Sequence, residues 1–301
     1  KAMTLPSQPK TMVVVGSGAI GSEFAYFYQS IGTQVTLVEF MPNVVPLEDE
    51  EVSKQLERSF KKMGMKVMTS STVEKVDTSG EGCKVTIKTK KGEEVVDVDV
   101  VLSAVGITPN IEGIGLEELG VAVENGRIKV DEYYKTNVEG VYAIGDIIAT
   151  PALAHVASAE GITCVEKIAG LNPESIDYKN IPGCTYTHPE ISSVGLTEAK
   201  AKEAGYEVKV GKFPFSANSR AITNLNQSPG LVKILFDKNS QKILGAHIMC
   251  PGAGEMIHEL VLAVEYGATV EDVARASHGH PTLSEAVKEA AMAGFFKPIH
   301  V

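Results

Sequence analysis

The sequence predicts an α/β fold followed by an α+β part, and three observations support this prediction. Residues 10–39 show a strand–helix–strand pattern, in which the apolar runs 12–15 and 35–38 flank a glycine-rich turn and a stretch with helical periodicity. A hairpin pattern at 83–98 interrupts the alternation of strands and helices and predicts a β-meander. From Ile181 onward, short strand patterns are followed by helical patterns, as in an α+β arrangement.

The glycine-rich turn has the GxGxxG spacing of Rossmann-like dinucleotide sites, and its residues are Gly16, Ser17, Gly18, Ala19, Ile20 and Gly21. The first glycine permits the tight turn, the second lets the backbone approach a pyrophosphate, and the third lets helix and strand pack closely. Free N–H groups at the start of the next helix can bind the phosphates. The turn therefore predicts dinucleotide binding. The alternative is an ordinary strand–helix–strand unit with a glycine-rich turn.

Glu39 lies at the end of the second predicted strand, where a carboxylate can accept hydrogen bonds from both ribose hydroxyls. The same carboxylate would repel a 2′-phosphate, so the sequence predicts NAD rather than NADP. The alternative reading of the turn leaves Glu39 unexplained.

Composition narrows the possible partners. The chain has 301 residues, enough for two or three domains, and a net charge of −10, which disfavours nucleic acid and anionic membranes. No apolar run is long enough to span a bilayer, and the first residues, beginning with Lys1, look like the end of a longer segment. Four widely separated cysteines show no metal-binding spacing, so we expect no metal site and reduced thiols at Cys83, Cys164, Cys184 and Cys250.

Periodicity and turn residues predict the other elements in order. Helices are expected at 50–63, 153–169, from a Thr197 cap to Gly205, and at 254–266, 270–276 and 283–293. Strands are expected at 65–76, as one strand with an extension, and at 83–89, 93–98, 100–105, 127–130, 140–144, 185–187, 192–196, 207–215, 231–237 and 242–250.

The strand predicted at 140–144 ends in Gly145 and Asp146. This would place one carboxylate at the carboxyl edge of a sheet, where α/β proteins bind ligands. Asp146 could equally be a turn or cap residue, and the pattern alone leaves both readings open.

The stretch 278–286, HGHPTLSEA, combines two histidines with the start of the last predicted helix. Thr282 and Glu285 match a capping box, and Pro281 disfavours helical dihedrals at His280. A carboxylate one turn from an imidazole fixes the ring tautomer and stabilises the protonated ring, as a general base requires. The alternative is a surface loop in which Glu285 only caps. The expected buried stripe of the helix is Leu283, Ala286, Val287 and Ala290.

Several motifs in this order resemble those of the dihydrolipoamide dehydrogenases within the flavin disulfide-reductase family, and the resemblance covers essentially the whole chain. The motifs are VVVGSGAIGSEFA at 13–25, Ala104-Val105-Gly106 with Pro109-Asn110, GVYAIGD at 140–146, Leu153-Ala154-His155, PEISSVGLTE at 189–198 and HGHPTLSEA at 278–286.

The resemblance implies oxidation of dihydrolipoamide through an active-site disulfide, with electrons passing to FAD and then as hydride to NAD. It implies a Rossmann-like NAD-binding domain with a β-meander, the second half of an FAD-binding domain and an α+β interface domain that forms a homodimer. The implied boundaries are a linker at 1–9 and domains at 10–112, 113–178 and 179–301.

The resemblance also assigns roles to single residues. Glu39 would bind the adenosine ribose of NAD, Val73 would lie near its adenine and Gly106 near its phosphate-nicotinamide portion. His280 would take the dithiol proton at the flavin of the partner subunit, and Glu285 would orient it. The residues expected at FAD are Gly145, Asp146, Leu153, Ala154 and His155.

Two departures from the family pattern affect these expectations. Ile107 follows Gly106 where family members commonly have arginine, so one contact to NAD is expected to be absent. The upstream FAD part, with paired redox cysteines four residues apart, is not in this sequence, so we expect the chain alone to be inactive.

Three alternatives stay open. Glutathione-type reductases are expected to have basic residues after the second strand, where this chain has Glu39-Phe40. Mercuric reductases are expected to have a cysteine pair near the carboxyl end, and residues 294–301 contain no cysteine. The chain could also be an NAD-binding dimerisation module without turnover.

For the dehydrogenase, the implied partner is a lipoyl-bearing acyltransferase or carrier of a 2-oxo acid dehydrogenase or glycine cleavage complex. The implied location is a bacterial cytoplasm or a mitochondrial matrix.

Overall fold

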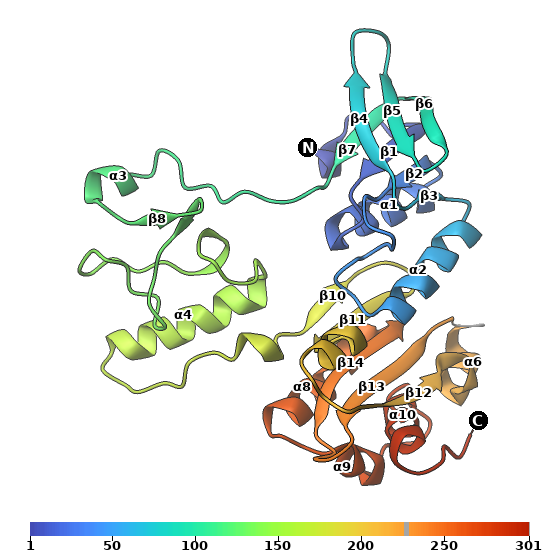
Figure 1. Ribbon diagram of the computed structural model, residues 1–301, viewed down its shortest axis with the longest axis vertical. Helices are drawn as coiled ribbons and strands as arrows, with labels where there is room; N and C mark the ends of the chain where they lie inside the picture. The colour runs from blue at the N-terminus through green and yellow to red at the C-terminus, as the bar shows by residue number, and fades with distance from the viewer. Residues whose placement is uncertain (226–228, 301) are drawn as a thin grey trace. The chain divides into compact units, whose positions relative to one another are not determined.

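The computed structural model describes residues 1–225 and 229–300, and the chain folds into two compact units. One unit combines Lys1–Val105 with Pro182–Val301, and the other is Gly106–Ile181 (Figure 1). The units reflect contacts within the chain, whereas the expected domains were defined by the cofactor each would bind. The domain boundaries therefore stay predictions.

The amino-terminal part of the larger unit is a four-stranded parallel sheet with strand order β3-β2-β1-β7. The central strand β1 has three consecutive buried residues, as expected for a parallel strand covered on both faces. The elements are η1 (Ala2–Thr4), β1 (Thr11–Val15), α1 (Ala19–Ser30), β2 (Gln34–Val38), α2 (Glu50–Lys62), β3 (Lys66–Met68) and β7 (Val100–Ser103). The predicted strand–helix–strand unit is thereby confirmed.

A three-stranded antiparallel meander covers one face of this sheet. It consists of β4 (Thr72–Asp77), β5 (Cys83–Thr89) and β6 (Gly92–Val98), in that spatial order. Val85 and Ile87 of β5 are fully buried against Val13 and Val38 of the parallel sheet. The predicted hairpin and meander are therefore confirmed.

The prediction of a single strand at 65–76 is wrong, because the chain leaves the parallel sheet and enters the meander between these residues. Ser70 adopts a left-handed φ of 50°, and its N–H donates to the Met41 carbonyl at 2.9 Å. β3 therefore ends in the parallel sheet, and β4 begins in the meander. The strand predicted at 100–105 is shorter and only half-buried, because β7 lies at the edge of its sheet.

The carboxyl-terminal part of the larger unit is a five-stranded antiparallel sheet, in the order β10-β11-β14-β13-β12, with helices. Its strands are β10 (Gly183–Thr185), β11 (Glu190–Gly195), β12 (Val208–Pro214), β13 (Leu231–Asp237) and β14 (Ile243–Cys250). Its helices are α5 (Glu198–Glu203), η4 (Phe215–Ala217), α6 (Ser219–Leu225), α7 (Ala253–Met256), α8 (His258–Glu265), α9 (Val270–Arg275) and α10 (Glu285–Phe295). The α+β prediction holds, although α6 was missed and the helix predicted at 254–266 is two helices.

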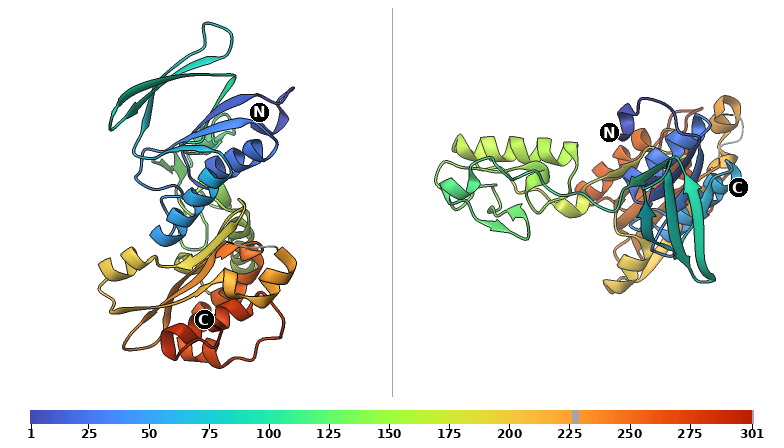
Figure 2. Two further views of the ribbon diagram at one scale, coloured as in Figure 1. Left: turned by 90° about the vertical axis from the view of Figure 1, so that its right-hand side faces the viewer. Right: turned by 90° about the horizontal axis from the view of Figure 1, so that it is seen from above.

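The central strands of the antiparallel sheet, β13 and β14, are buried on both faces. Val232, Ile234 and Phe236 of β13 share a cluster with α8, α9 and α10. Leu231 and Met249 point the other way and share a cluster with the parallel sheet and α2. Figure 2 shows α2 between the two sheets. All seven residues of β13 are buried, including the charged Lys233 and Asp237, because neither face is open to solvent.

The smaller unit has little regular structure beyond one long helix. Its elements are α3 (Leu116–Leu119), β8 (Val123–Glu124), β9 (Arg127–Ile128), η2 (Gly145–Ile147), α4 (Ala154–Ile168) and η3 (Tyr178–Asn180). The strand predicted at 140–144 is wrong, because the segment makes only one isolated bridge, between Lys135 and Tyr142, among the described residues. Asp146 therefore follows a loop rather than a strand, and its side chain is exposed.

In the described part of the chain, every helix is too short or too polar to cross a bilayer.

Candidate functional site

Two of the fingerprint glycines are required by packing. A Cβ atom on Gly21 would lie 1.9 Å from the Gly16 carbonyl oxygen. Gly16 has a φ of +91°, and a Cβ atom there would lie 2.6 Å from the Ala104 carbonyl oxygen. These contacts confirm a tight turn and a close approach of α1 to β1.

Gly18 differs from Gly16 and Gly21, because no contact within the chain requires a glycine at position 18. Its φ of −60° suits any residue, and no heavy atom lies within 4 Å of an ideal Cβ position. The open space lies at the first turn of the twelve-residue helix α1, where no side chain caps the N–H groups. A phosphate fits this position, since it would bind those N–H groups and be blocked by a side chain at 18.

Glu39 is 6% exposed and is held by the turn itself. Its Oε2 atom accepts from the Ser17 N–H at 2.7 Å and from the Ser17 hydroxyl at 2.8 Å. Its Oε1 atom accepts from the Met41 N–H at 2.7 Å. A carboxylate has about four acceptor positions, so about one is left for a ribose hydroxyl. Binding both hydroxyls would require the Ser17 hydroxyl to release its bond.

Ser17 was not predicted as a site residue, although it is fully buried and connects the turn to Glu39. It occupies an unspecified position of the fingerprint, so no local pattern marks it. Val73 lies in β4, two residues after Ser71, whose N–H donates to the Glu39 carbonyl at 2.9 Å. Gly106 belongs to the smaller unit. It has a φ of +150° and no heavy atom within 4 Å of an ideal Cβ.

In the smaller unit, the structure brings the Gly145 turn against the start of α4. Gly145 has a φ of +72°, and a Cβ atom there would lie 3.1 Å from the Ala157 Cβ. Its N–H donates to Glu160 Oε2 at 2.6 Å, and the Tyr178 hydroxyl donates to Glu160 Oε1 at 2.9 Å. Glu160 is fully buried and was not predicted. The helical stretch carries two acids, Glu160 and Glu166, and no local pattern marks Glu160 as the buried one.

Leu153 is the N-cap of α4 and Ala154 its first residue, and no side chain caps this helix. The N–H groups of its first turn can therefore face an anion or a polarised ring atom. His155 and Asp146 are both exposed in the same unit.

The predicted imidazole–carboxylate pair is confirmed at the start of α10. His280 Nδ1 lies 2.9 Å from Glu285 Oε1, and the other carboxylate oxygen accepts from the Thr282 N–H at 2.8 Å. Because a carboxylate only accepts, Nδ1 carries the proton and Nε2 is the basic nitrogen of the neutral ring. The side chain of His280 is 72% exposed and that of Glu285 22% exposed. The pair lies in a small pocket, the histidine pocket, which is lined by Phe213, Ala217, Asn218, Ser219, His280, Glu285, Glu289 and His300. None of the fingerprint residues lines it.

The electrostatics of Glu285 agree with this geometry. Burial on its own would raise the pKa of the Glu285 carboxyl. The Thr282 N–H and the His280 imidazole outweigh burial and hold this pKa below its ordinary value. Glu285 is therefore ionised at neutral pH and able to stabilise a protonated imidazole.

The predicted capping box of α10 is only half correct. The Thr282 hydroxyl donates to the Gly279 carbonyl at 2.7 Å instead of accepting from the helix, and the N-cap is Ser284, which makes no side-chain cap. The loop folds back on itself, and this uses the hydroxyl. The buried stripe is confirmed, with Ala286, Val287 and Ala290 fully buried and Leu283 partly buried.

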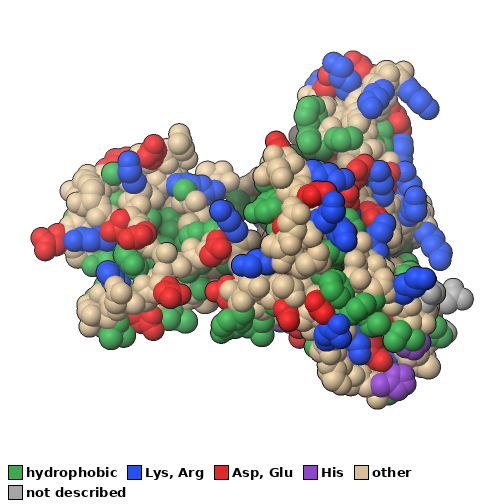
Figure 3. Space-filling view, turned by 60° about the horizontal axis from the view of Figure 1, so that its bottom comes forward, with side chains coloured by type: hydrophobic (Ala, Val, Ile, Leu, Met, Phe, Trp, Pro, Cys, Tyr) green, Lys and Arg blue, Asp and Glu red, His purple; other side chains and the backbone are tan. Residues whose placement is uncertain are grey.

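A second imidazole–carboxylate pair lines the same pocket and was not predicted. His300 Nδ1 lies 2.7 Å from Glu289 Oε1, and Glu289 follows Glu285 by one helical turn. Glu289 is 5% exposed and also accepts from the Ile299 N–H at 2.8 Å, which ties the tail to α10. Figure 3 shows histidine side chains at the surface on the face turned toward the viewer.

Two family models together match most of the chain. The model of the pyridine nucleotide-disulphide oxidoreductases matches residues 1–161, and the model of the dimerisation domain of the same family matches residues 181–291.

The chain belongs to the pyridine nucleotide-disulphide oxidoreductase family.

Within this family the relatives include dihydrolipoyl dehydrogenases. The chain is 50% identical to the mitochondrial dihydrolipoyl dehydrogenase of Pisum sativum, over the whole chain and 60% of that protein. It is 45% identical to the dihydrolipoyl dehydrogenase of Rhizobium etli, over 97% of the chain and 61% of that protein. The chain thus spans about 60% of the length of the curated relatives it matches. These findings confirm the resemblance and the α/β fold with an α+β part.

Solved structures give the same fold. LpdA from Mycobacterium tuberculosis has a TM-score of 0.86 at 30% identity, over 95% of this chain and 62% of that one. The HOCl-induced flavoprotein disulfide reductase RclA from Escherichia coli has a TM-score of 0.87 at 25% identity, over 95% of this chain and 65% of that one.

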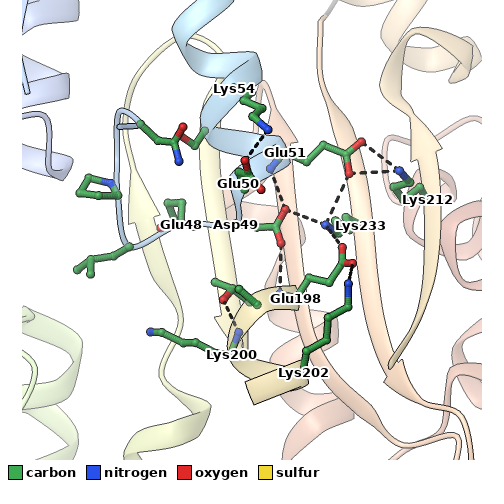
Figure 4. A pocket seen from close by; sticks show the side chains of 16 residues that line it. Glu48, Asp49, Glu50, Glu51, Lys54, Glu198, Lys200, Lys202, Lys212 and Lys233 are labelled. Atoms are coloured by element: carbon green, nitrogen blue, oxygen red, sulfur yellow. Dashed lines mark hydrogen bonds and ion pairs between the residues drawn. The ribbon is translucent and has the colours of Figure 1, made fainter. Parts of the chain in front are cut away.

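A separate charged pocket, of about 790 Å³, lies where α2 and α5 approach the antiparallel sheet (Figure 4). At its base Lys233, 3% exposed, donates to Asp49 Oδ1 and Glu198 Oε2, each at 2.8 Å. Burial lowers the pKa of Lys233, but the bonds to Asp49 and Glu198 outweigh burial and raise it. The charges satisfy one another, so we interpret this cluster as structural.

The thiols are free among the described residues, as expected. Burial raises the pKa of both Cys164 and Cys250. Neither thiol therefore has the thiolate character of a redox nucleophile.

Proposed function

We propose that this chain supplies the NAD-binding, proton-accepting and dimer-forming parts of a dihydrolipoamide dehydrogenase. One observation carries the proposal. An open space beside Gly18, whose neighbour Ser17 binds the buried carboxylate of Glu39, occurs in the same unit as the 2.9 Å pair of His280 and Glu285. The names of relatives at 45% and 50% identity support the choice of reaction.

The turn Gly16–Gly21 and the start of α1 would bind the pyrophosphate of NAD, and Glu39 would accept from the adenosine ribose. Val73 would lie near the adenine, and Gly106 near the nicotinamide half. NAD supplies hydride acceptance when bound. The residues of the chain hold it and exclude the 2′-phosphate of NADP.

In the smaller unit, the residues that would hold FAD are Gly145, Asp146, Leu153, Ala154 and His155. The uncapped start of α4 fits this role, because its N–H groups would stabilise negative charge on the reduced flavin. FAD supplies two-electron transfer between the disulfide and NAD when bound.

His280 would accept a thiol proton at Nε2 while Glu285 holds Nδ1. Oxidation breaks two S–H bonds of dihydrolipoamide and forms one S–S bond. Two electrons and one proton leave as the hydride that reduces NAD, and the second proton leaves to solvent. His280 would perform this step at the flavin of the partner subunit, which is why the homodimer matters. The match to the dimerisation domain supports that assembly.

The substrate would be presented by a lipoyl-bearing acyltransferase or carrier of a 2-oxo acid dehydrogenase or glycine cleavage complex. A bacterial cytoplasm and a mitochondrial matrix both suit this role, since relatives come from both sources.

Calorimetric titration of the chain with NADH and NADPH tests the nucleotide site. We expect NADH to bind, and NADPH to bind at least about tenfold more weakly because of Glu39. Gly18→Ala should weaken NADH binding at least about tenfold and cost less than about 1 kcal/mol of stability, because its φ suits alanine. Equal affinity for the two nucleotides, or unchanged NADH binding by Gly18→Ala, would contradict the proposal.

A second candidate function, an NAD-binding dimerisation module, is favoured by the cysteines. No two of the four are four residues apart. We expect the 301-residue chain, mixed with dihydrolipoamide and NAD, to form no NADH. NADH formation by this chain alone, followed by its absorbance, would exclude the module and place a redox centre within it.

A further inference from the structure

The loop that carries His280 has few constraints of its own. It runs from the end of α9 at Arg275 to the start of α10 at Glu285. Its internal hydrogen bonds are local, such as the Thr282 hydroxyl to the Gly279 carbonyl at 2.7 Å. A loop of this kind gives a precise geometry only where another element holds it.

Asn218 provides such a contact from a distant part of the sequence. It is 4% exposed and lines the pocket that contains His280 and Glu285. Its Nδ2 atom donates to the Thr282 carbonyl at 3.0 Å and to the Leu283 carbonyl at 3.4 Å. These carbonyls belong to the turn from which α10 begins.

The same side chain also caps a helix. The Oδ1 atom of Asn218 accepts from the Ala221 N–H at 2.9 Å, in the first turn of α6. Capping alone would be served as well by serine or aspartate, which are about as effective as asparagine. Ionised aspartate has no proton to donate to the loop, and the hydroxyl of serine, one bond shorter than the amide, would have to serve both contacts with a single atom. The contact with the loop, rather than the capping of α6, therefore explains why this residue is an asparagine.

We propose that Asn218 is a positioning residue for the His280–Glu285 pair. The amide holds the Thr282 carbonyl, the Thr282 N–H holds Glu285 Oε2 at 2.8 Å, and Glu285 Oε1 holds His280 Nδ1 at 2.9 Å. The chain of bonds runs from a buried amide to the imidazole. The value of this arrangement for dithiol oxidation rests on the proposed function, but the arrangement itself does not.

Two variants separate the loop contact from the cap. Asn218→Ser keeps a capping oxygen, adds no charge and is too short to reach Thr282. Asn218→Ala removes both contacts. Thr197→Ala is the control, because it removes the side-chain cap of α5 and Thr197 does not line the histidine pocket.

NMR of the 301-residue chain provides readouts that a purely structural role would not move. In Asn218→Ser, we expect the pKa of the Glu285 carboxyl to rise toward its ordinary value and the Thr282 amide to exchange about tenfold faster. Asn218→Ala should give the same two changes together with a lower free energy of unfolding. Thr197→Ala should change only that free energy.

Unchanged Glu285 titration and unchanged Thr282 exchange in Asn218→Ser would overturn the proposal and leave Asn218 as a cap. Neither readout involves nucleotide or thiol chemistry. If NADH fails to bind while both NMR changes occur, the proposed function falls and the positioning role stands.

Discussion

The two faces of the antiparallel sheet carry acid–base groups with opposite designs. On one face, Lys233 is 3% exposed and bound by Asp49 and Glu198, each at 2.8 Å. On the other face, the loop before α10 places His280, 72% exposed, against Glu285 at 2.9 Å. Both are ion-pair geometries of similar length. They differ in burial and in whether a polar atom is left over for another molecule.

This difference separates a structural cluster from a chemical one. Lys233 donates to Asp49 and Glu198 and also has Glu51 Oε2 at 3.6 Å. Asp49 in turn accepts from the Glu51 N–H at 3.1 Å as the cap of α2. His280 uses one ring nitrogen for Glu285 and keeps the other for a proton. A saturated buried cluster joins parts of a fold, whereas an unsaturated exposed pair can act on a substrate.

The largest expected effect comes from Lys233→Met. Removing one partner of a buried ion pair leaves Asp49 and Glu198 uncompensated, so we expect a loss of about 3–5 kcal/mol in the free energy of unfolding. Urea denaturation measures it. Lys212→Met is the matched control. Lys212 likewise pairs with a carboxylate, that of Glu51, but its side chain is half-exposed. A loss of unfolding free energy no larger than that of the control would show that the cluster does not hold the amino-terminal and carboxyl-terminal parts of the larger unit together.

The pH dependence of the free energy of unfolding tests the same face through His247. It lies beside Lys233 in the sheet, and burial lowers its pKa, with Asp49 opposing. The ring therefore stays neutral in the folded chain where the unfolded chain would protonate it. Its contribution is complete above the unfolded pKa of about 6.5 and is lost as pH falls below it, by about 1.4 kcal/mol per pH unit.

His247→Gln should remove this slope, because glutamine does not titrate but can still donate to the Leu196 carbonyl, as Nε2 does at 3.0 Å. The measurement is urea denaturation of both proteins between about pH 5 and pH 8. Burial raises the pKa of Glu48 and gives a slope of opposite sign, but it is common to both proteins and cancels in their difference. A constant difference across this range would refute the assignment.

The same contrast explains what the sequence could predict. The fingerprint, Glu39 and the His280–Glu285 pair are local patterns, so the spacing of their residues along the chain is enough to reveal them. The Lys233 cluster joins positions 49, 198 and 233, which no local pattern connects. Its only sign was a lysine inside the apolar run LVKILFD.

Non-local contacts also account for the wrong elements. The strand predicted at 65–76 divides between two sheets, and the one predicted at 140–144 finds no ladder among the described residues. Hydrophobic pattern indicates that a segment can be a strand, but pairing partners decide whether it is one. Ser17 and Asn218 were missed for the same reason, since each acts through a residue more than twenty positions away.

The smallest expected effect is that of His280→Gln. We expect a change below about 0.5 kcal/mol in the free energy of unfolding at neutral pH, because exposed ion pairs contribute little. Glu285 keeps the Thr282 N–H after the imidazole is removed, so no carboxylate is left unpartnered, in contrast to Lys233→Met. Urea denaturation and NADH titration measure it, and NADH binding should be unchanged because no fingerprint residue lines the pocket. A loss above about 1 kcal/mol would place His280 with Lys233 among the residues that hold the fold, and the chemical reading of its face would then lose its basis.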